Sequence, residues 1–226
     1  CFNDLMDIES DRNHPRKRLR PIASGEISRQ NAEILAIVLI CTALICAWFL
    51  SKNFFFVCLI ILTLNIAYSL KLKHIPLIDV ITIGILFLLR VASGITLVSV
   101  KLFSPWLYVV TFMLALYLGF GKRRAEIAML PEAMNQTRPA LDGYSIPFLD
   151  QMITIVSSVT IMSYTLYTFS GPTLPSGNKM MLTVPFVIYG VFRYHWLIQL
   201  KHEGGAPEEV LFSDRALQIT IVLYAL

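Results

Sequence analysis

Three aspartates near the start of the chain have the spacing of a metal site. Asp4, Asp7 and Asp11 are three and four residues apart in "NDLMDIESD", so on a helix they fall on one face with Asn3 beside them. Carboxylates so close together repel one another, and aspartate is a poor helix former. Proteins usually bind Mg²⁺ through a few carboxylates, with water and substrate phosphates as the other ligands. The pattern predicts a Mg²⁺ site; the alternative is a solvated helix end with scattered acids.

A strongly basic segment follows the aspartates directly. It reads "HPRKRLRP" over residues 14–21. Arginine and lysine pair with phosphate oxygens, so beside a Mg²⁺ motif this run predicts a phosphate clamp. The other interpretation is a basic anchor that contacts anionic lipids at the membrane surface.

Long apolar stretches must position these charged segments. The chain is 56% hydrophobic with a mean hydropathy of +0.65, far from an ordinary soluble domain. A membrane-spanning helix needs about 20 mostly apolar residues, and its backbone must satisfy its own hydrogen bonds. We therefore expect an all-α, polytopic helical membrane protein with about seven spans, preceded by a stub of an earlier helix at 1–11. The predicted spans are 31–50, 53–70, 77–99, 104–121, 147–170, 180–200 and 212–226.

The loops between these spans differ sharply in charge. Fifteen of the nineteen lysines and arginines lie in or beside the loops of one side, which also holds the long loops 11–29, 122–146 and 201–213. Basic loops stay in the cytoplasm. We expect a multi-pass protein of the inner (plasma) membrane whose active site faces the cytoplasm, with no nucleic-acid partner.

A few charged residues lie inside or at the ends of the spans. Arg90 is inside a span, which makes it a candidate for binding an acceptor phosphate in a cavity. Asp79 is eleven residues away, about 16 Å along a helix, too far to pair with Arg90. We expect Asp150 and Arg193, near span ends, to form structural pairs. The cysteines and histidines are scattered and suggest no metal centre or nucleophilic triad.

The charged segments also resemble a known family. "NDLMDIESD" matches the N-D-x-x-D-x-x-x-D signature of the UbiA superfamily of intramembrane prenyltransferases, and "DRNHPRKRLRPIASGEIS" resembles its continuation. The resemblance implies nine helices around a cavity, with acidic motifs after helices 2 and 6 that hold a diphosphate through Mg²⁺. By that count residues 1–226 are a single transmembrane domain with helices 3 to 9. By the same count we expect helix 1 and most of helix 2 to be missing at the N-terminus, and we expect the C-terminus to be truncated too.

The second acidic motif of that superfamily is replaced here by bases. After the span 104–121 the sequence reads "LGFGKRRAEIAML", with Lys122, Arg123 and Glu126 where two aspartates are expected. Bases suit a donor with an additional phosphate, such as phosphoribosyl diphosphate, which has a diphosphate for the metal and a separate 5′-phosphate. "GKRRAE", "RPALDGYSIPFLD", "YSLKLKHIPLIDV", "LLRVASG", "PFVIYGVFRYHWL" and "PEEVLFSD" resemble the decaprenyl-phosphate phosphoribosyltransferase branch.

This resemblance implies a reaction and a set of site residues. The reaction is Mg²⁺-dependent transfer of 5-phosphoribose from phosphoribosyl diphosphate to a polyprenyl (decaprenyl-type) phosphate, in the synthesis of cell-wall arabinan precursors. The implied catalytic residues are Asp4, Asp7, Asp11 and Lys122, and the three aspartates are the metal ligands. The implied substrate-binding residues are Asn3, Lys17, Arg20, Tyr68, Lys71, Arg90, Arg123, Glu126, Arg138 and Tyr144.

Two of these roles stay open. Glu126 either orients Lys122, four residues earlier, or binds a ribose hydroxyl. Tyr68 contacts the diphosphate or is an aromatic residue of the membrane interface. The lipid acceptor is already an anion, so no strong general base is needed, and positioning with electrostatics supplies most of the rate.

Two other functions compete with this one. A prenyltransferase that moves a prenyl diphosphate onto an aromatic or lipid acceptor would need a second aspartate-rich motif, which 121–130 does not contain. A transporter would place its acids near the membrane midplane, whereas these acids lie at the predicted cytoplasmic edge.

Overall fold

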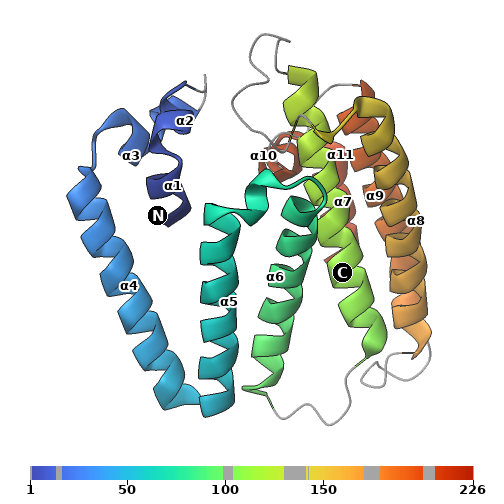
Figure 1. Cartoon of the computed structure of the whole chain (residues 1–226). Helices are drawn as coiled ribbons and strands as arrows, with labels where there is room; N and C mark the ends of the chain where they lie inside the picture. Colours follow the sequence, from blue (N-terminus) through green and yellow to red (C-terminus); the bar gives the residue numbers. More distant parts are fainter. Residues whose placement is uncertain are drawn as a thin grey trace. The chain divides into compact units, whose positions relative to one another are not determined.

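The computed structural model describes residues 2–13, 17–98, 104–129, 141, 143–170, 179–200 and 207–225 (Figure 1). Within these ranges the chain forms helices and short 3₁₀ turns, without a strand. The helices group into two compact units. The first unit contains residues 1–82 and 89–99, and the second unit contains 83–88 and 100–226.

The first unit consists of a charged segment and a pair of long apolar helices. The charged segment comprises α1 (Phe2–Met6), α2 (Ile8–Asn13), the 3₁₀ turn η1 (Lys17–Leu19) and α3 (Pro21–Ser24). It is followed by α4 (Arg29–Leu50), α5 (Lys52–Leu70), the turn η2 (Leu72–His74) and α6 (Ile78–Ile95), whose central residues group with the second unit.

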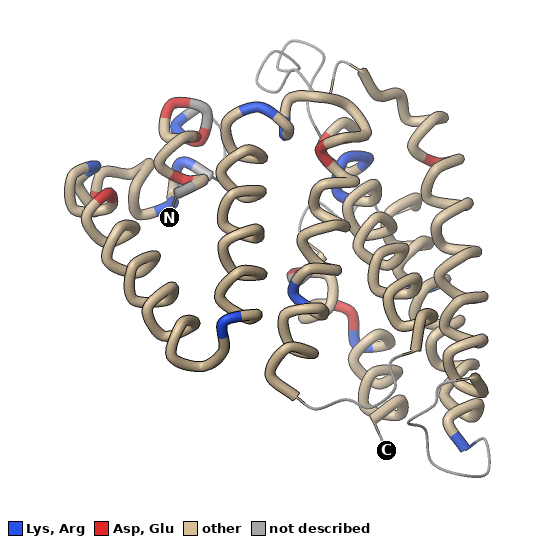
Figure 2. Tube along the Cα trace, turned by 60° about the horizontal axis from the view of Figure 1, so that its bottom comes forward, with Lys and Arg blue, Asp and Glu red and all other residues tan. Residues whose placement is uncertain are grey.

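One serine makes the tight connection between α4 and α5. The backbone amide of Ser51 donates to the Ala47 carbonyl at 3.1 Å at the end of α4. The Ser51 hydroxyl accepts from the Phe54 amide at 3.5 Å at the start of α5. The two helices therefore run antiparallel as a hairpin, with charges only near their ends (Figure 2). Their sides are apolar, and Phe49 is 83% exposed, as expected for a helix that lipid surrounds.

The second unit is a bundle of longer helices. It contains α7 (Pro105–Met129), α8 (Ile146–Ser170), the turn η5 (Lys179–Thr183), α9 (Val184–Leu200), α10 (Pro207–Ser213) and α11 (Arg215–Ala225). Buried Tyr117 ties α7 to α9, because its hydroxyl donates to the Val191 carbonyl at 2.8 Å. Gly121 lets these helices approach closely: a Cβ there would lie 2.7 Å from Ile198 Cδ1.

The helical membrane architecture predicted from sequence is confirmed. In the described ranges six helices are long and apolar enough to cross a membrane: α4, α5, α6, α7, α8, and η5 together with α9. The seventh predicted span, 212–226, corresponds to α11, an apolar helix of eleven residues.

One predicted boundary is wrong. Helix α7 does not end at residue 121 but continues to Met129. The residues from 122 to 129 are mostly good helix formers and include no glycine or proline, so nothing interrupts the helix. "GKRRAE" is therefore the end of a helix rather than a loop.

Candidate functional site

The predicted alignment of the aspartates follows from an almost continuous helix. Helices α1 and α2 join around Asp7, whose amide donates to the Asn3 carbonyl at 3.0 Å. The Asp11 amide in turn donates to the Asp7 carbonyl at 2.7 Å. These are helical i to i−4 bonds, so Asp4, Asp7 and Asp11 keep the shared helix face that their spacing predicts.

Two of the three carboxylates share one cation. Nη1 of Arg20 lies 2.9 Å from Asp4 Oδ1 and 2.8 Å from Asp11 Oδ2. The side chain of Asp11 is 5% exposed, that of Asp4 33% and that of Arg20 42%. The turn from η1 into α3 brings Arg20 back over the acids, so the basic segment contacts the acidic one directly.

The third carboxylate is held by a different set of groups. Asp7 Oδ1 accepts from the ammonium group of Lys73, whose side chain is 5% exposed. Asp7 Oδ2 accepts from the side-chain amide (Nδ2) of Asn3 at 3.1 Å, and Asn3 Oδ1 accepts from the hydroxyl of Ser69 at 3.3 Å. Both oxygens of Asp7 are thus fixed against the end of α5 and the turn η2.

Sequence reasoning selected Lys71 and missed Lys73. Lys71 is exposed at the end of α5, whereas Lys73 is buried in η2. The spacing in "KLK" does not separate them, because the direction of each side chain depends on how the 3₁₀ turn folds back toward Asp7. The signal in the sequence is only that two lysines follow the helix within three residues.

The acidic segment suits a Mg²⁺ ion that takes few protein ligands. Among the residues that the structure describes, no three His, Cys, Asp or Glu side chains converge as metal ligands. Mg²⁺ in proteins often takes only one or two carboxylates and completes its shell with water and substrate phosphates. Asp4 and Asp11 already close around one cationic nitrogen, which stands in for a metal ion. This donor pair fits Mg²⁺.

The second unit carries a basic cluster at the end of α7. Nη1 of Arg123 lies 2.5 Å from Glu126 Oε2, and the Arg123 side chain is 3% exposed. The sequence predicts Lys122 as the possible partner of Glu126; the structure pairs Glu126 with Arg123 instead. Positions three and four residues away lie on the same helix side, so the spacing allows either pair. Lys122 is half-buried beside them.

Two further ion pairs hold helices of the second unit together. Nε of Arg124 contacts Asp150 Oδ1 at 2.5 Å, and Nη1 donates to the Ile198 carbonyl at 2.9 Å, which ties α7 to α8 and α9. Nη2 of Arg193 contacts Asp214 Oδ2 at 2.8 Å, and Asp214 Oδ1 accepts from the Leu217 amide at the start of α11. The prediction that Asp150 and Arg193 form structural pairs is confirmed.

The remaining predicted residues lie at several places. Tyr144 is buried just before α8 and stacks on Phe148, with ring centroids 6.3 Å apart. Tyr68 is half-buried in the last turn of α5, and Arg90 is exposed on α6. Arg138 and the side chain of Lys17 lie outside the described residues.

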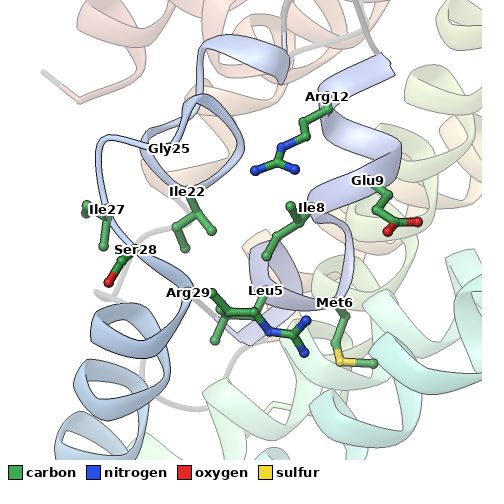
Figure 3. Close-up of a pocket in the computed structure, with 10 residues that line it drawn as sticks. All are labelled: Leu5, Met6, Ile8, Glu9, Arg12, Ile22, Gly25, Ile27, Ser28 and Arg29. Carbon is green, nitrogen blue, oxygen red and sulfur yellow. The ribbon is translucent and has the colours of Figure 1, made fainter.

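A cavity of about 410 Å³, called the rear cavity below, lies beside the acidic segment (Figure 3). Arg12 and Arg29 line it together with the apolar side chains of Leu5, Ile8 and Ile22. Arg12 Nε donates to the Ala23 carbonyl at 3.1 Å, which fixes α2 to α3. The acidic segment contributes Leu5, Met6, Ile8, Glu9 and Arg12 to the wall, which alternate with the three aspartates along the chain, and residues between 22 and 29 form the rest.

A second cavity lies inside the second unit. It has a volume of about 360 Å³ and is lined mainly by aliphatic and aromatic side chains of α7 to α11. Four tyrosines contribute to the wall: Tyr117, Tyr164, Tyr194 and Tyr224. An apolar cavity with a few hydroxyl groups suits a hydrocarbon ligand.

Six apolar helices long enough to span a membrane, with charged clusters near helix ends, define a polytopic membrane protein. The sequence profile of the UbiA prenyltransferase family matches residues 1–213. The chain therefore belongs to the UbiA prenyltransferase family and is a membrane transferase, as the signature in residues 3–11 predicts.

Curated relatives and solved structures agree with this assignment. A decaprenyl-phosphate phosphoribosyltransferase of Mycobacterium tuberculosis is 30% identical over 220 residues, which cover 96% of this chain and 71% of the relative. The enzyme of the same name from Corynebacterium glutamicum is 32% identical over 222 residues, covering 96% and 66%. A UbiA homolog from Archaeoglobus fulgidus bound to GPP and Mg²⁺ superposes with a TM-score of 0.74 at 19% identity, over 99% of this chain and 78% of the homolog. At that identity the likeness shows the fold alone.

Proposed function

We propose that this protein transfers 5-phosphoribose from phosphoribosyl diphosphate to a polyprenyl phosphate of decaprenyl type. The main support for this proposal is the basic end of α7. Glu126 is the only acid between residues 121 and 129, and the buried guanidinium of Arg123 holds its carboxylate at 2.5 Å. A carboxylate so occupied is a poor ligand for a second Mg²⁺, whereas the neighbouring Lys122, which has no ion pair with a described residue, suits a phosphate group. The activity in the names of two relatives, at 30% and 32% identity, points to the same substrates.

The proposed reaction exchanges one bond at the anomeric carbon of the ribose. The bond to the diphosphate oxygen breaks, a lipid phosphate oxygen forms the new bond, and diphosphate leaves. Because the acceptor oxygen is already negative, the reaction needs no residue that removes a proton. A bound Mg²⁺ would neutralise the charge that develops on the departing diphosphate.

The residues of the two charged clusters would divide the binding of phosphates and metal. Asp4 and Asp11 would hold the metal, with Asp7 beside them fixed by Lys73. Lys17 and Arg20 would bind phosphate oxygens next to it. Lys122 would bind a donor phosphate, and Arg123 would support it. Lysine is a compact, mobile cation, so a half-buried Lys122 can follow a phosphate that enters and leaves.

The lipid part of the acceptor would use the apolar cavity of the second unit. At about 360 Å³ this cavity is far smaller than a decaprenyl chain, so only a few isoprene units would lie in it. The rest of the chain would remain in the bilayer. We place the charged clusters on the cytoplasmic side of the inner membrane, where basic loops are retained. There the product would feed the synthesis of cell-wall arabinan precursors.

A second candidate function is prenyl transfer from a prenyl diphosphate to an aromatic or lipid acceptor. The observation in its favour is the similarity of the fold to a homolog bound to GPP and Mg²⁺. Both reactions would use the acidic segment in the same way. They differ in Lys122, because a prenyl diphosphate has no third phosphate for it to bind.

The test is an assay of the purified protein in detergent with Mg²⁺, phosphoribosyl diphosphate and a short polyprenyl phosphate. Mass spectrometry should find the phosphoribosylated lipid with the wild type and far less of it with Lys122→Ala. If no such product forms and geranyl diphosphate with an aromatic acceptor is turned over, the second candidate replaces the first.

A further inference from the structure

The cation between Asp4 and Asp11 is the most accessible member of its cluster. Arg20 is 42% exposed, and within the described residues its guanidinium makes its polar contacts to those two carboxylates. Asp11, by contrast, is 5% exposed and cannot follow a moving partner. Arg20 can therefore leave the acids by rotating its side chain, while the acids stay in place.

A metal ion and Arg20 cannot occupy the same position between these carboxylates. Both are cations, and the same two oxygens lie within 2.9 Å of Arg20 Nη1. Two like charges forced together there would repel strongly. A Mg²⁺ ion that takes Asp4 Oδ1 and Asp11 Oδ2 as its ligands must therefore displace the guanidinium.

The pair formed by Asp7 and Lys73 does not share this property. Lys73 is 5% exposed, and the second oxygen of Asp7 is held by Asn3. Taking Lys73 away from Asp7 would leave a buried charge without a partner, which is strongly unfavourable. One ion pair of the segment is thus a fixed support and the other can be exchanged.

We propose that Arg20 is the counter-cation of the metal-free site and that Mg²⁺ displaces it. The displaced guanidinium then binds the diphosphate of the donor, since its planar fork of N–H groups matches phosphate oxygens. Metal and donor consequently bind together more tightly than either binds alone. The inference rests on the proposed function, because it takes a metal and a diphosphate as the ligands of this segment.

The experiment measures the binding of Mn²⁺ alone, as a spectroscopic substitute for Mg²⁺, to the whole purified protein. Electron paramagnetic resonance reports the loss of the free Mn²⁺ signal on binding. Arg20→Met should bind Mn²⁺ about tenfold more tightly than the wild type, because a competing cation with two charge-assisted hydrogen bonds is gone. Arg20→Gln, also neutral but polar, should behave in the same way and provides a second variant if Arg20→Met does not fold.

Arg18→Met is the matched control. Arg18 is an exposed base two residues earlier, in η1, and the structure gives it no ion pair in the described part of the chain. Its Mn²⁺ affinity should equal that of the wild type. Equal affinities in the wild type and both Arg20 variants would overturn the exchange, and Mg²⁺-dependent turnover of the wild type would then show that the proposed function survives. Absence of Mn²⁺ binding in every protein, even with phosphoribosyl diphosphate added, would overturn both.

Discussion

The charged clusters of the two units have opposite arrangements. Among the described residues of the first unit, Asp4 and Asp11 pair with Arg20, and Asp7 pairs with Lys73. At the end of α7, Arg123 pairs with Glu126 and Arg124 pairs with Asp150, and Lys122 lies half-buried beside them. The first cluster suits a cation and the second suits an anion. In the proposed function, the first cluster would bind a metal and the second would bind a phosphate.

The clusters also differ in which partner is buried. Arg20 is exposed over a buried acid, whereas Arg123 and Arg124 are 3% and 7% exposed and their acids are more accessible. A buried guanidinium with several hydrogen bonds holds helices in place, while an exposed one can move to a ligand. We therefore assign Arg124 to the fold and Arg20 to binding.

The largest effect is expected at the aspartate pair. Asp4→Asn or Asp11→Asn removes half of the carboxylate pair, so turnover should fall by at least about 100-fold, with Mn²⁺ affinity falling in parallel. Mass spectrometric product assays would measure the loss. Glu9→Gln is the control, because Glu9 is exposed and lines the rear cavity. Wild-type turnover in Asp4→Asn would contradict the metal assignment.

A smaller loss is expected at the half-buried base of α7. Lys122→Ala should reduce kcat/KM for the donor by about 10- to 100-fold, mainly through a higher KM, because one charge-assisted phosphate contact is lost. Lys122→Arg should recover part of the lost kcat/KM. Lys179→Ala, at the start of η5, removes a base without touching the cluster and should have no effect. An unchanged KM in Lys122→Ala would show that Lys122 does not bind the donor.

Arg124 should matter for stability rather than for turnover per folded molecule. Arg124→Met removes the ion pair with Asp150 and the bond to the Ile198 carbonyl. Because Asp150 is 32% exposed, water recovers part of the loss, and we expect about 2 kcal/mol of destabilisation. Chemical unfolding in detergent would measure it. Arg29→Met breaks an exposed pair with Glu33 and should cost at most about 0.5 kcal/mol. Equal losses in both variants would refute the structural role.

The smallest effect concerns the support of the basic cluster. Gly121→Ala places a Cβ 2.7 Å from Ile198 Cδ1, the end of a flexible side chain, so we expect a destabilisation of about 1 kcal/mol. Gly94→Ala meets nothing within 4 Å and should be neutral or slightly stabilising, since alanine favours a helix. Thermal unfolding of the two variants side by side would show the difference. A stabilised Gly121→Ala would mean that α7 and α9 do not depend on this close approach.

The sequence predicts what depends on local pattern. The six long spans follow from apolar length, and the common face of Asp4, Asp7 and Asp11 follows from helical spacing. The partners of charged residues do not follow in this way. Lys73 rather than Lys71 reaches Asp7 because of how the turn η2 folds. The spacing allows Glu126 to pair with Lys122, four residues earlier, or Arg123, three residues earlier, and the structure shows the pair with Arg123. Such choices are made by tertiary packing, which one sequence does not encode in its spacing.

The most direct measurement is a competition between the two donors in one reaction. The purified protein is given Mg²⁺, equal amounts of phosphoribosyl diphosphate and geranyl diphosphate, a polyprenyl phosphate and an aromatic acceptor, with Asp4→Asn as the background. We expect phosphoribosylated lipid as the main product by mass, and no such product with Asp4→Asn. Prenylated acceptor as the main product would contradict this function, because a prenyl diphosphate has no third phosphate for Lys122 to bind.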